Sequence, residues 1–311
     1  MGIKQLNRLM RQYSQQQKIT INELSNKTIT IDIMIYIYKF LANDSLLEDI
    51  YLMCVLLKHN NINGIFVFDG EKPKEKQQEL SLRREKRKQA WLKYDEIVNN
   101  IGEGKVNEQD MKFELIKLKR QCIKIKSNHI RDVQNLLTYF GMTYVVADGE
   151  ADKLCAELVI NNKAYACLSD DMDLFMYGCP IVLRLFSITK KTLYIYNLQN
   201  ILKDLNITFH NFQIICALSG TDYNVENQVN SIFIIYKKYL YYCKLDTNDN
   251  FLDWLVKDDF KFDLKRLIDT IEMFKVNTSY NYNPIINHFI DKINLYALLE
   301  KEYFLNPIVV Y

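Results

Sequence analysis

Seven carboxylates of this chain lie in short motifs beside apolar runs, where an acid contributes little to stability. A buried carboxylate without a partner costs several kcal/mol, and acids that converge on one place repel each other. Divalent cations would remove both penalties, because carboxylate oxygens are the ligands that Mg²⁺ prefers. Two such ions about 4 Å apart suit phosphodiester hydrolysis. The candidate metal ligands are Asp32, Asp69, Glu150, Asp152, Asp171, Asp173 and Asp222.

The charge distribution points to a polyanionic partner. The chain carries a net charge of +2, but residues 71–130 hold 16 Lys and Arg against 10 Asp and Glu, a local net charge of +6. The remainder holds 24 basic and 28 acidic residues, a net charge of −4. A basic segment beside an acidic pocket fits a polyanion gripped next to a metal site.

The composition is that of a protein with a sizeable core. The 311 residues are 49% hydrophobic and fit one large α/β unit. No apolar run reaches about 18 residues, and the N-terminus lacks the apolar segment of a secretory signal, so we expect neither a membrane partner nor secretion. Seven cysteines without a CxxC pair favour reduced intracellular thiols over disulfides or zinc. We expect an intracellular protein, with the nucleus and a cytoplasmic replication site both open as its location.

Two buried strands would position the first two acids. Residues 27–37 (KTITIDIMIYI) are apolar and β-branched, as in a strand buried on both faces, and Asp32 lies inside the run. A helix is expected at 46–59, and a second buried strand at 62–68 ends at Asp69. The strand–helix–strand order predicts a parallel sheet, whose sites form at the carboxyl ends of its strands.

The remaining elements continue this α/β pattern. Residues 71–128 are charged and rich in helix formers, which predicts two helices broken near 99–104. Asp222 is expected in a turn, and residues 245–311 are mixed and rich in aromatic residues. We also expect a helix at 129–140, strands at 142–146 and 164–168, and a hairpin of 181–186 with 192–196.

Six sequence motifs follow one another in the order of a known family. They are MGIKQL, TIDIMIYIYKF, FVFDGEKP, DGEADKLCAEL, SDDMDLFMYG and LSGTDY. In these motifs the chain resembles the flap endonuclease family of structure-specific 5′ nucleases, within the PIN-like superfamily. The resemblance runs from residue 1 to about residue 222, and so many motifs in one order are improbable by chance.

The resemblance implies two Mg²⁺ ions, for which Mn²⁺ is expected to substitute. Asp152 stands where the family has the longer Glu, two residues after Glu150. Because residues i and i+2 of a regular helix face apart, a bend or a cap-like conformation is implied there. The resemblance assigns Asp32, Asp69, Glu150 and Asp152 to one ion and Asp171, Asp173 and Asp222 to the other, with Asp69 and Asp171 also expected to be catalytic.

The resemblance also implies DNA contacts from a helical arch. Lys76 and Arg83 match two basic catalytic residues at the base of the arch, and their spacing of seven places both on one helix face. Plainer readings stay open, because Tyr38 could be a core aromatic, Gly2 could permit a tight N-terminus and a charged helix could be a solvated face. The expected DNA-binding residues are Gly2 near the metals, Tyr38 on a base, Lys76 and Arg83 at the scissile phosphate, Arg84 and Arg87 along a passage for the 5′ strand, and Lys237 and Lys238 on the duplex.

Three departures from the family bear on substrate choice. Asp32 and Asp69 are only 37 residues apart, which implies a trimmed wedge for splitting duplexes. The stretch after Asp222, NVENQVNSIFIIYKKYLYYCK, has no glycine, so a backbone phosphate nest is disfavoured there. The final residues NPIVVY are not a clamp-binding tail, so no sliding-clamp partner is expected in that mode.

These observations predict an α/β fold. We expect a mainly parallel sheet flanked by helices (the PIN-like/5′-nuclease fold), with an inserted helical arch and a helical C-terminal part. One nuclease domain would span 1–311. Its parts would be an N-terminal nuclease region (1–98), the arch (71–128), an internal nuclease region with a modified helix–hairpin–helix-like segment (129–240) and a C-terminal extension packed on the core (241–311).

The expected function is Mg²⁺-dependent, structure-specific hydrolysis of DNA by a monomer. The substrates would be 5′ flaps, gaps or free 5′ ends that arise in replication, repair or recombination. Two alternatives stay open. A 5′→3′ exonuclease of the same superfamily is favoured by the trimmed wedge, and a non-catalytic DNA-binding scaffold is disfavoured by the intact acid set.

Overall fold

The computed structural model describes residues 2–103, 105–223, 231–258, 260–277, 284 and 289–301. Within these residues the centre of the fold is a seven-stranded sheet of order β1-β7-β6-β5-β2-β3-β4. The five strands from β6 to β4 are parallel, and β7 runs antiparallel to both of its neighbours. The strands are β1 (Gln17–Thr20), β2 (Thr28–Asp32), β3 (Asn63–Phe68), β4 (Thr143–Val146), β5 (Ala166–Leu168), β6 (Ile181–Ser187) and β7 (Thr192–Asn197).

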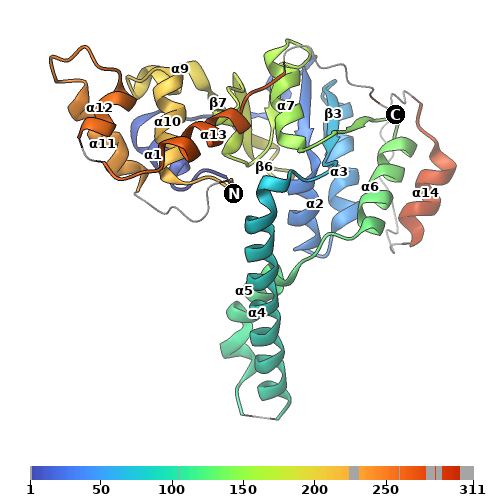
Figure 1. Ribbon diagram of the computed structural model, residues 1–311. Coiled ribbons are helices and arrows are strands. Elements are labelled where there is room, and N and C mark those ends of the chain that lie inside the picture. The colour runs from blue at the N-terminus through green and yellow to red at the C-terminus, as the bar shows by residue number, and fades with distance from the viewer. Residues whose placement is uncertain are drawn as a thin grey trace.

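Helices cover both faces of this sheet, which confirms the predicted α/β class (Figure 1). Successive side chains of a strand point to opposite faces, so Ile65 and Val67 enter one core while Phe66 and Phe68 enter the other. The Phe66 side holds α2 (Ile33–Leu41), α3 (Leu46–His59), α6 (Ser127–Tyr139) and α14 (Lys292–Lys301). The Val67 side holds α1 (Leu6–Tyr13), α7 (Ala151–Ile160), α8 (Asp173–Met176), α9 (Leu198–Asp204), α10 (Phe209–Ser219), α11 (Ile232–Tyr242), α12 (Phe251–Lys257) and α13 (Leu264–Met273).

The first predicted strand was wrong in its extent. The run 27–37 divides into β2, which ends at Asp32, and helix α2, which begins at Ile33. A short apolar run that is buried on all sides does not distinguish strand from helix by periodicity. The correction places Asp32 at the end of its strand rather than inside it. The sequence reading also missed β1, a short and mostly exposed edge strand.

The helical arch is present as predicted. It consists of α4 (Gln77–Gly102) and α5 (Glu108–Cys122), which pack against each other and project from the body (Figure 1). Of the α4 side chains only Ala90 is buried, so the arch has a thin apolar seam and a broad charged surface. A short 3₁₀ turn, η2 (Lys74–Lys76), leads from the sheet into α4.

The connection between α2 and α3 is short. Helices α2 and α3 are joined by residues 42–45 alone, so no inserted wedge stands between them. The sequence signals in 224–230 and 302–311 lie outside the described residues, as does much of the segment between α13 and α14.

None of the helices in the described ranges is both long and apolar enough to cross a membrane.

Candidate active site

Four neighbouring parallel strands end in acids at one edge of the sheet. Asp32 closes β2, Asp69 follows β3, Glu150 lies shortly after β4, and Asp171 follows β5. Because the carboxyl ends of parallel strands meet at the same edge, the topology brings these side chains together. The remaining predicted ligands come from adjoining helix ends and turns, Asp152 and Asp173 from the first turns of α7 and α8 and Asp222 from the turn after α10.

Two glycines allow β3 and β4 to end against each other. The Gly70 N–H donates to the carbonyl of Gly149 at 2.7 Å, and the Ala151 N–H donates to Asp69 Oδ1 at 3.0 Å. A Cβ on Gly70 would lie 1.9 Å from the carbonyl oxygen of Ala147, so only glycine fits there. Glu150 caps α7 with an extended backbone, which is the cap-like conformation that its spacing from Asp152 required.

Asp32 is a buried acid at the end of β2. It is 5% exposed and accepts a hydrogen bond from Ser169 Oγ at 3.0 Å. Burial and, less strongly, the charges of Asp69 and Asp171 together raise its pKa to about 8, although the hydrogen bond from Ser169 lowers it. A carboxylate in this state gains from a nearby cation, because a positive charge favours its ionised form.

Asp173 shows the same need more directly. Among the described residues, neither of its carboxylate oxygens has a hydrogen-bond partner, although both are buried. Burial and the charge of Asp171 raise its pKa well above the usual range. The Asp171 and Asp173 Oδ1 atoms each lie 2.4 Å from the position of a Cβ on Gly2, whose φ is +75°. Gly2 therefore lies directly against the acids, where any side chain would collide.

Lys76 brings a cation from the arch base into the acid cluster. It is 7% exposed, and its Nζ lies 2.6 Å from Glu150 Oε1 and 4.6 Å from the ring centre of Tyr223. Burial alone would lower the pKa of this amine, but the charges of Asp152 and Glu150 outweigh burial and raise it. The Tyr223 hydroxyl donates to Glu150 as well. Sequence reasoning missed Tyr223, although it directly follows Asp222 in the SGTDY motif.

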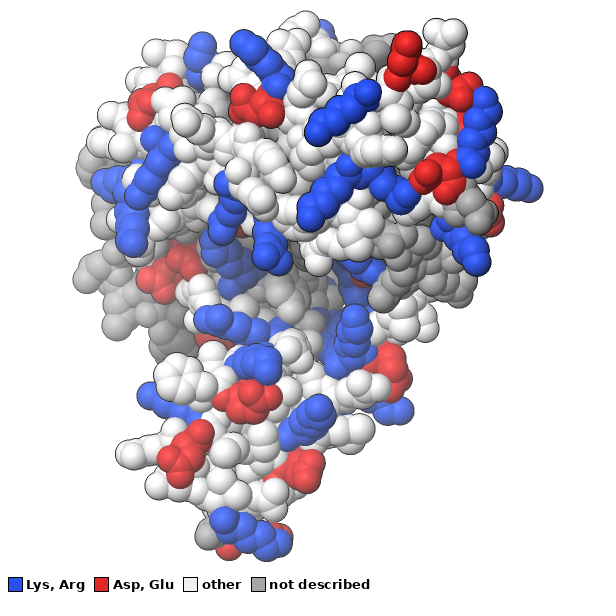
Figure 2. All heavy atoms as spheres, turned by 90° about the vertical axis from the view of Figure 1, so that its left-hand side faces the viewer, with Lys and Arg blue, Asp and Glu red and all other residues white. Residues whose placement is uncertain are grey.

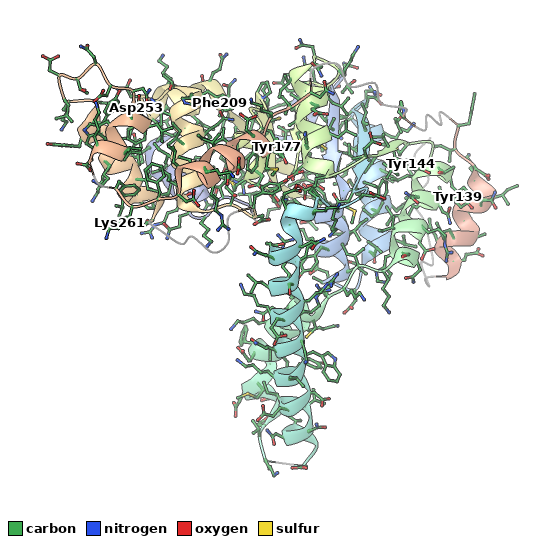
Figure 3. The ribbon with its side chains drawn as sticks, viewed as in Figure 1. Tyr139, Tyr144, Tyr177, Phe209, Asp253 and Lys261 are labelled. Carbon is green, nitrogen blue, oxygen red and sulfur yellow. The ribbon has the colours of Figure 1, made fainter. Side chains whose placement is uncertain are left out.

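Arg83 makes the second contact between arch and acids. Its Nη2 lies 2.7 Å from Asp222 Oδ2, and its Nε pairs with Glu79 one turn earlier on α4. Tyr177, labelled in Figure 3, lies where the arch meets the body, with its hydroxyl 3.4 Å from that of Tyr223. The two predicted arch cations thus both reach the predicted acids.

The acid cluster fits divalent metal, although its side chains do not enclose an ion as they stand. Among the described residues, no three Asp, Glu, His or Cys side chains are grouped closely enough to hold one. Two of the acids, Glu150 and Asp222, are instead paired with Lys76 and Arg83. The partnerless oxygens of Asp173 are what a cation would satisfy.

The other predicted DNA contacts lie apart from this contact network. Tyr38 is 40% exposed and its hydroxyl donates to the carbonyl of Arg120 near the end of α5, at 2.7 Å. Lys238 is held by an ion pair with Asp258 and lies over the Trp254 ring. Figure 2 shows Lys and Arg side chains on both the arch and the body, around the hollow between them. Arg84 is exposed and Arg87 half-buried on α4, and Lys237 is exposed on α11.

Comparison with known proteins gives consistent matches. The model of the XPG N-terminal domain matches residues 1–90 and that of the XPG I-region matches residues 141–222, together more than half of the chain. Flap endonuclease 1 of Methanococcus aeolicus is 29% identical over 225 residues, which cover 67% of this chain and 66% of the relative. Flap endonuclease 1 of Enterocytozoon bieneusi is 28% identical over 308 residues, which cover 92% of this chain and 82% of the relative.

Solved structures share the fold. The catalytic core of Rad2 in complex with DNA substrate is 20% identical in sequence and superimposes with a TM-score of 0.67, covering 97% of this chain and 95% of that one. Flap endonuclease-1 from Methanococcus jannaschii is 22% identical, with a TM-score of 0.66, and the match covers 96% of this chain and 93% of that one.

Proposed function

The chain belongs to the flap endonuclease and XPG family of nucleases, and we propose that it is a Mg²⁺-dependent, structure-specific 5′ nuclease of DNA. The observation that carries this proposal is the acid cluster at the sheet edge, with the arch cation Lys76 buried among the acids. Acids and cation together provide for metal binding and for contact with a phosphodiester.

The acids would serve two ions, in the two groups that the resemblance implies. When bound, Mg²⁺ or Mn²⁺ would supply a nucleophilic water and stabilise the leaving oxygen. Ser169 and the Ala151 N–H orient Asp32 and Asp69, so these carboxylates are held before any ion arrives. One ion would be held by Asp32, Asp69, Glu150 and Asp152, and the other by Asp171, Asp173 and Asp222.

The arch would act on the DNA strand. Lys76 and Arg83 face the acids from one side of the arch base, where their charges would stabilise the extra negative charge of the scissile phosphate in the transition state. Arg84 and Arg87 would follow the 5′ strand along α4, and Tyr38 would stack on a base beside the arch base. Each of these side chains is at least partly exposed except Lys76.

The substrate would be DNA with a 5′ flap, a gap or a free 5′ end. The similar proteins support this choice, because the relatives are called flap endonuclease 1 and the Rad2 core was solved with a DNA substrate. Exposed Lys237 would contribute to holding the duplex, with Lys238 available once its pair with Asp258 opens. Such DNA arises in replication, repair and recombination.

The whole chain would form one nuclease domain that works as a monomer. The described part of the C-terminal extension supports this, because Leu295 and Leu299 of α14 are buried in the same core as α6. The N–H of Asp291 also donates to the carbonyl of Tyr139 in α6 at 2.8 Å.

A 5′→3′ exonuclease is the second candidate function. The short connection between α2 and α3 favours it, because a nuclease without a wedge depends less on a branched junction. A non-catalytic scaffold is the third, and the complete acid set speaks against it.

One gel experiment tests all three. Labelled flap, gapped duplex and single-stranded DNA are incubated with Mg²⁺ or with EDTA, beside the Asp171→Asn variant. We expect short 5′ products from the flap and the gap in Mg²⁺ alone. Stepwise mononucleotides would favour the exonuclease, and binding without any cleavage would contradict the nuclease proposal.

A further inference from the structure

The SDDMD motif contains an acid, Asp170, to which the resemblance gives no role. Its carboxylate oxygen Oδ1 accepts a hydrogen bond from the backbone N–H of Leu185 at 2.7 Å. Its backbone carbonyl accepts a second from Arg184 Nη2 at 2.9 Å. Asp170 therefore faces strand β6, whereas its neighbour Asp171 belongs to the acid cluster.

Leu185 has an unusual backbone for a leucine in a strand. Its φ is +54°, in the left-handed region, and it lies at an irregularity between Arg184 and Ser187 in the pairing of β6 with β7. That conformation is unfavourable for a residue with a Cβ. The side chain is 39% exposed, so packing does not offset the cost. In this conformation the N–H of Leu185 donates to Asp170, and backbone strain beside an active site points to a function.

Arg184 extends the connection to the other side of the acids. It is only 5% exposed, lies 5.3 Å from the ring centre of Tyr196, and donates from Nη1 to Asn7 Oδ1 in α1 at 2.9 Å. The segment before α1 contains Gly2, which lies against Asp171 and Asp173. One buried guanidinium thus joins the turn that carries these acids to α1, the helix that follows the segment containing Gly2.

We propose that Asp170 is a positioning residue. Together with Arg184 and Leu185 it forms a brace that fixes the turn of residues 169–173. The brace holds that turn through atoms that are not needed for metal, which leaves the carboxylates of Asp171 and Asp173 directed into the cluster. The inference rests on the proposed function in one respect only, that Asp171 and Asp173 serve a metal ion.

Three substitutions of Asp170 separate a brace from a charge. Asp170→Asn keeps an oxygen where Leu185 donates and removes the charge. Asp170→Glu keeps the charge and displaces the oxygen by one methylene. Asp170→Ala removes both. If Asp170 is a brace, the Asn variant should bind Mn²⁺ more tightly than the Glu variant. If Asp170 acts through its charge or as a metal ligand, the Glu variant should bind more tightly.

The measurement is the affinity for Mn²⁺ by titration calorimetry, with the melting temperature in EDTA as a measure of folding. We expect the Asn variant to bind within about threefold of wild type and the Glu and Ala variants to bind at least about tenfold more weakly, a difference of about 1.4 kcal/mol. The melting temperatures of the Asn and Glu variants in EDTA should differ little. A difference in their Mn²⁺ affinity then cannot come from a difference in overall stability.

The outcomes are distinguishable. If the Ala variant does not fold, the Asn and Glu variants still decide the order. Glu at wild-type affinity with Asn weakened would overturn the brace, and so would equal affinity in all variants. A wild-type protein that binds no Mn²⁺ would overturn the metal assignment of the proposed function, and with it the premise of the brace.

Discussion

The acid edge of the sheet and the helical arch are both rich in charge, but the fold holds their charges in opposite ways. At the sheet edge Asp32 and Asp173 are buried, and neighbouring backbone and hydroxyl groups orient Asp32 and Asp69. On the arch helices Ala90 of α4 and Leu118 of α5 are buried, and most of the charged side chains are exposed. The edge therefore holds its acids through backbone geometry, whereas the cations of the arch are mostly exposed, apart from Lys76 and Arg83, which are held by ion pairs at its base.

The two regions meet at two ion pairs. Lys76 with Glu150 and Arg83 with Asp222 are the contacts through which the arch reaches the acids. The first pair is buried and the second is partly exposed, so the first should depend far less on salt. This difference gives four predictions, from the largest expected effect to the smallest.

Removing an acid of the sheet edge should have the largest effect. We expect Asp69→Ala or Asp171→Asn to lower the single-turnover cleavage rate by at least roughly a thousandfold, about 4 kcal/mol, because one metal ligand supplies several kcal/mol to the transition state. The melting temperature in EDTA should stay the same or rise, since a repelling carboxylate is gone.

The matched control is Asp148→Ala, an exposed acid two residues before Glu150. It should cleave at nearly the wild-type rate. If Asp171→Asn kept more than about a tenth of the wild-type rate, a loss of less than about 1.4 kcal/mol, the metal assignment of Asp171 would be wrong.

Removing an arch cation should have a smaller effect, and one confined to the chemical step. We expect Lys76→Ala and Arg83→Ala to lower the single-turnover rate by about a hundredfold, about 2.7 kcal/mol, while DNA affinity changes by less than about threefold. Exposed Lys93 of α4 provides the control, since its removal should change affinity and salt dependence alone. If both variants cleaved at the normal rate at saturating enzyme, Lys76 and Arg83 would serve only to bind DNA electrostatically, and the predicted role in the chemical step would be wrong.

The burial of Asp32 predicts how stability depends on pH without metal. Burial raises its pKa from the ordinary 3.8 to about 8, so the folded state keeps a proton that the unfolded state has lost. In EDTA this group should therefore destabilise the fold progressively as pH rises from about 4 to about 8. We expect the melting temperature of the wild-type protein to fall by several degrees between pH 5 and pH 8. The melting temperature of the Asp32→Asn variant should fall less over the same range.

The same scan with Mg²⁺ sharpens the result. An ion that binds the ionised acids stabilises the folded state more at high pH, so the fall should shrink or reverse. A melting temperature that does not change with pH in EDTA would show that Asp32 is not held in the low-dielectric setting that its burial indicates.

How far sequence reasoning reached differs between the two regions for a physical reason. Ordered motifs located the acids, and strand polarity predicted that Asp69 and Asp171, which follow their strands, would lie at one edge. Asp32 was expected inside its strand. The end of β2 was misplaced, because an apolar run without polar positions does not show where strand becomes helix. The arch helices followed from composition, and their break came near the expected residues.

The contacts made by single side chains were not readable in the same way. Tyr223 and the brace of Asp170, Arg184 and Leu185 depend on which residues far apart in the chain come together. Such partners have no spacing rule, and a left-handed leucine has no composition signal. Lys238 was expected to contact DNA because it lies in a run of basic and aromatic residues. That run gives no sign of the ion pair that Lys238 makes with Asp258.

Substrate preference should show the smallest effect, because it depends on exposed groups alone. Helices α2 and α3 are joined by residues 42–45 without a wedge, and the described duplex-facing candidates are the side chains Lys237 and Lys238. Side-chain contacts to phosphate release counterions, so they weaken steeply as salt rises. We expect flap, gap and recessed 5′ end to be cut within about tenfold of each other, about 1.4 kcal/mol, and all rates to fall together with salt.

Rates on a double flap, a gapped duplex and a blunt duplex at two salt concentrations measure this, with Lys237→Ala set against Lys238→Ala. Lys237 is exposed and should matter more than Lys238, which must first leave Asp258. Suppose instead that the double flap were preferred by about a hundredfold, about 2.7 kcal/mol, at high salt. Exposed cations cannot produce a preference that resists salt, so a shape-specific junction contact would then have to come from the body of the fold. The arch and the sheet edge would in that case share the task of recognition, and the contrast between them would hold for catalysis alone.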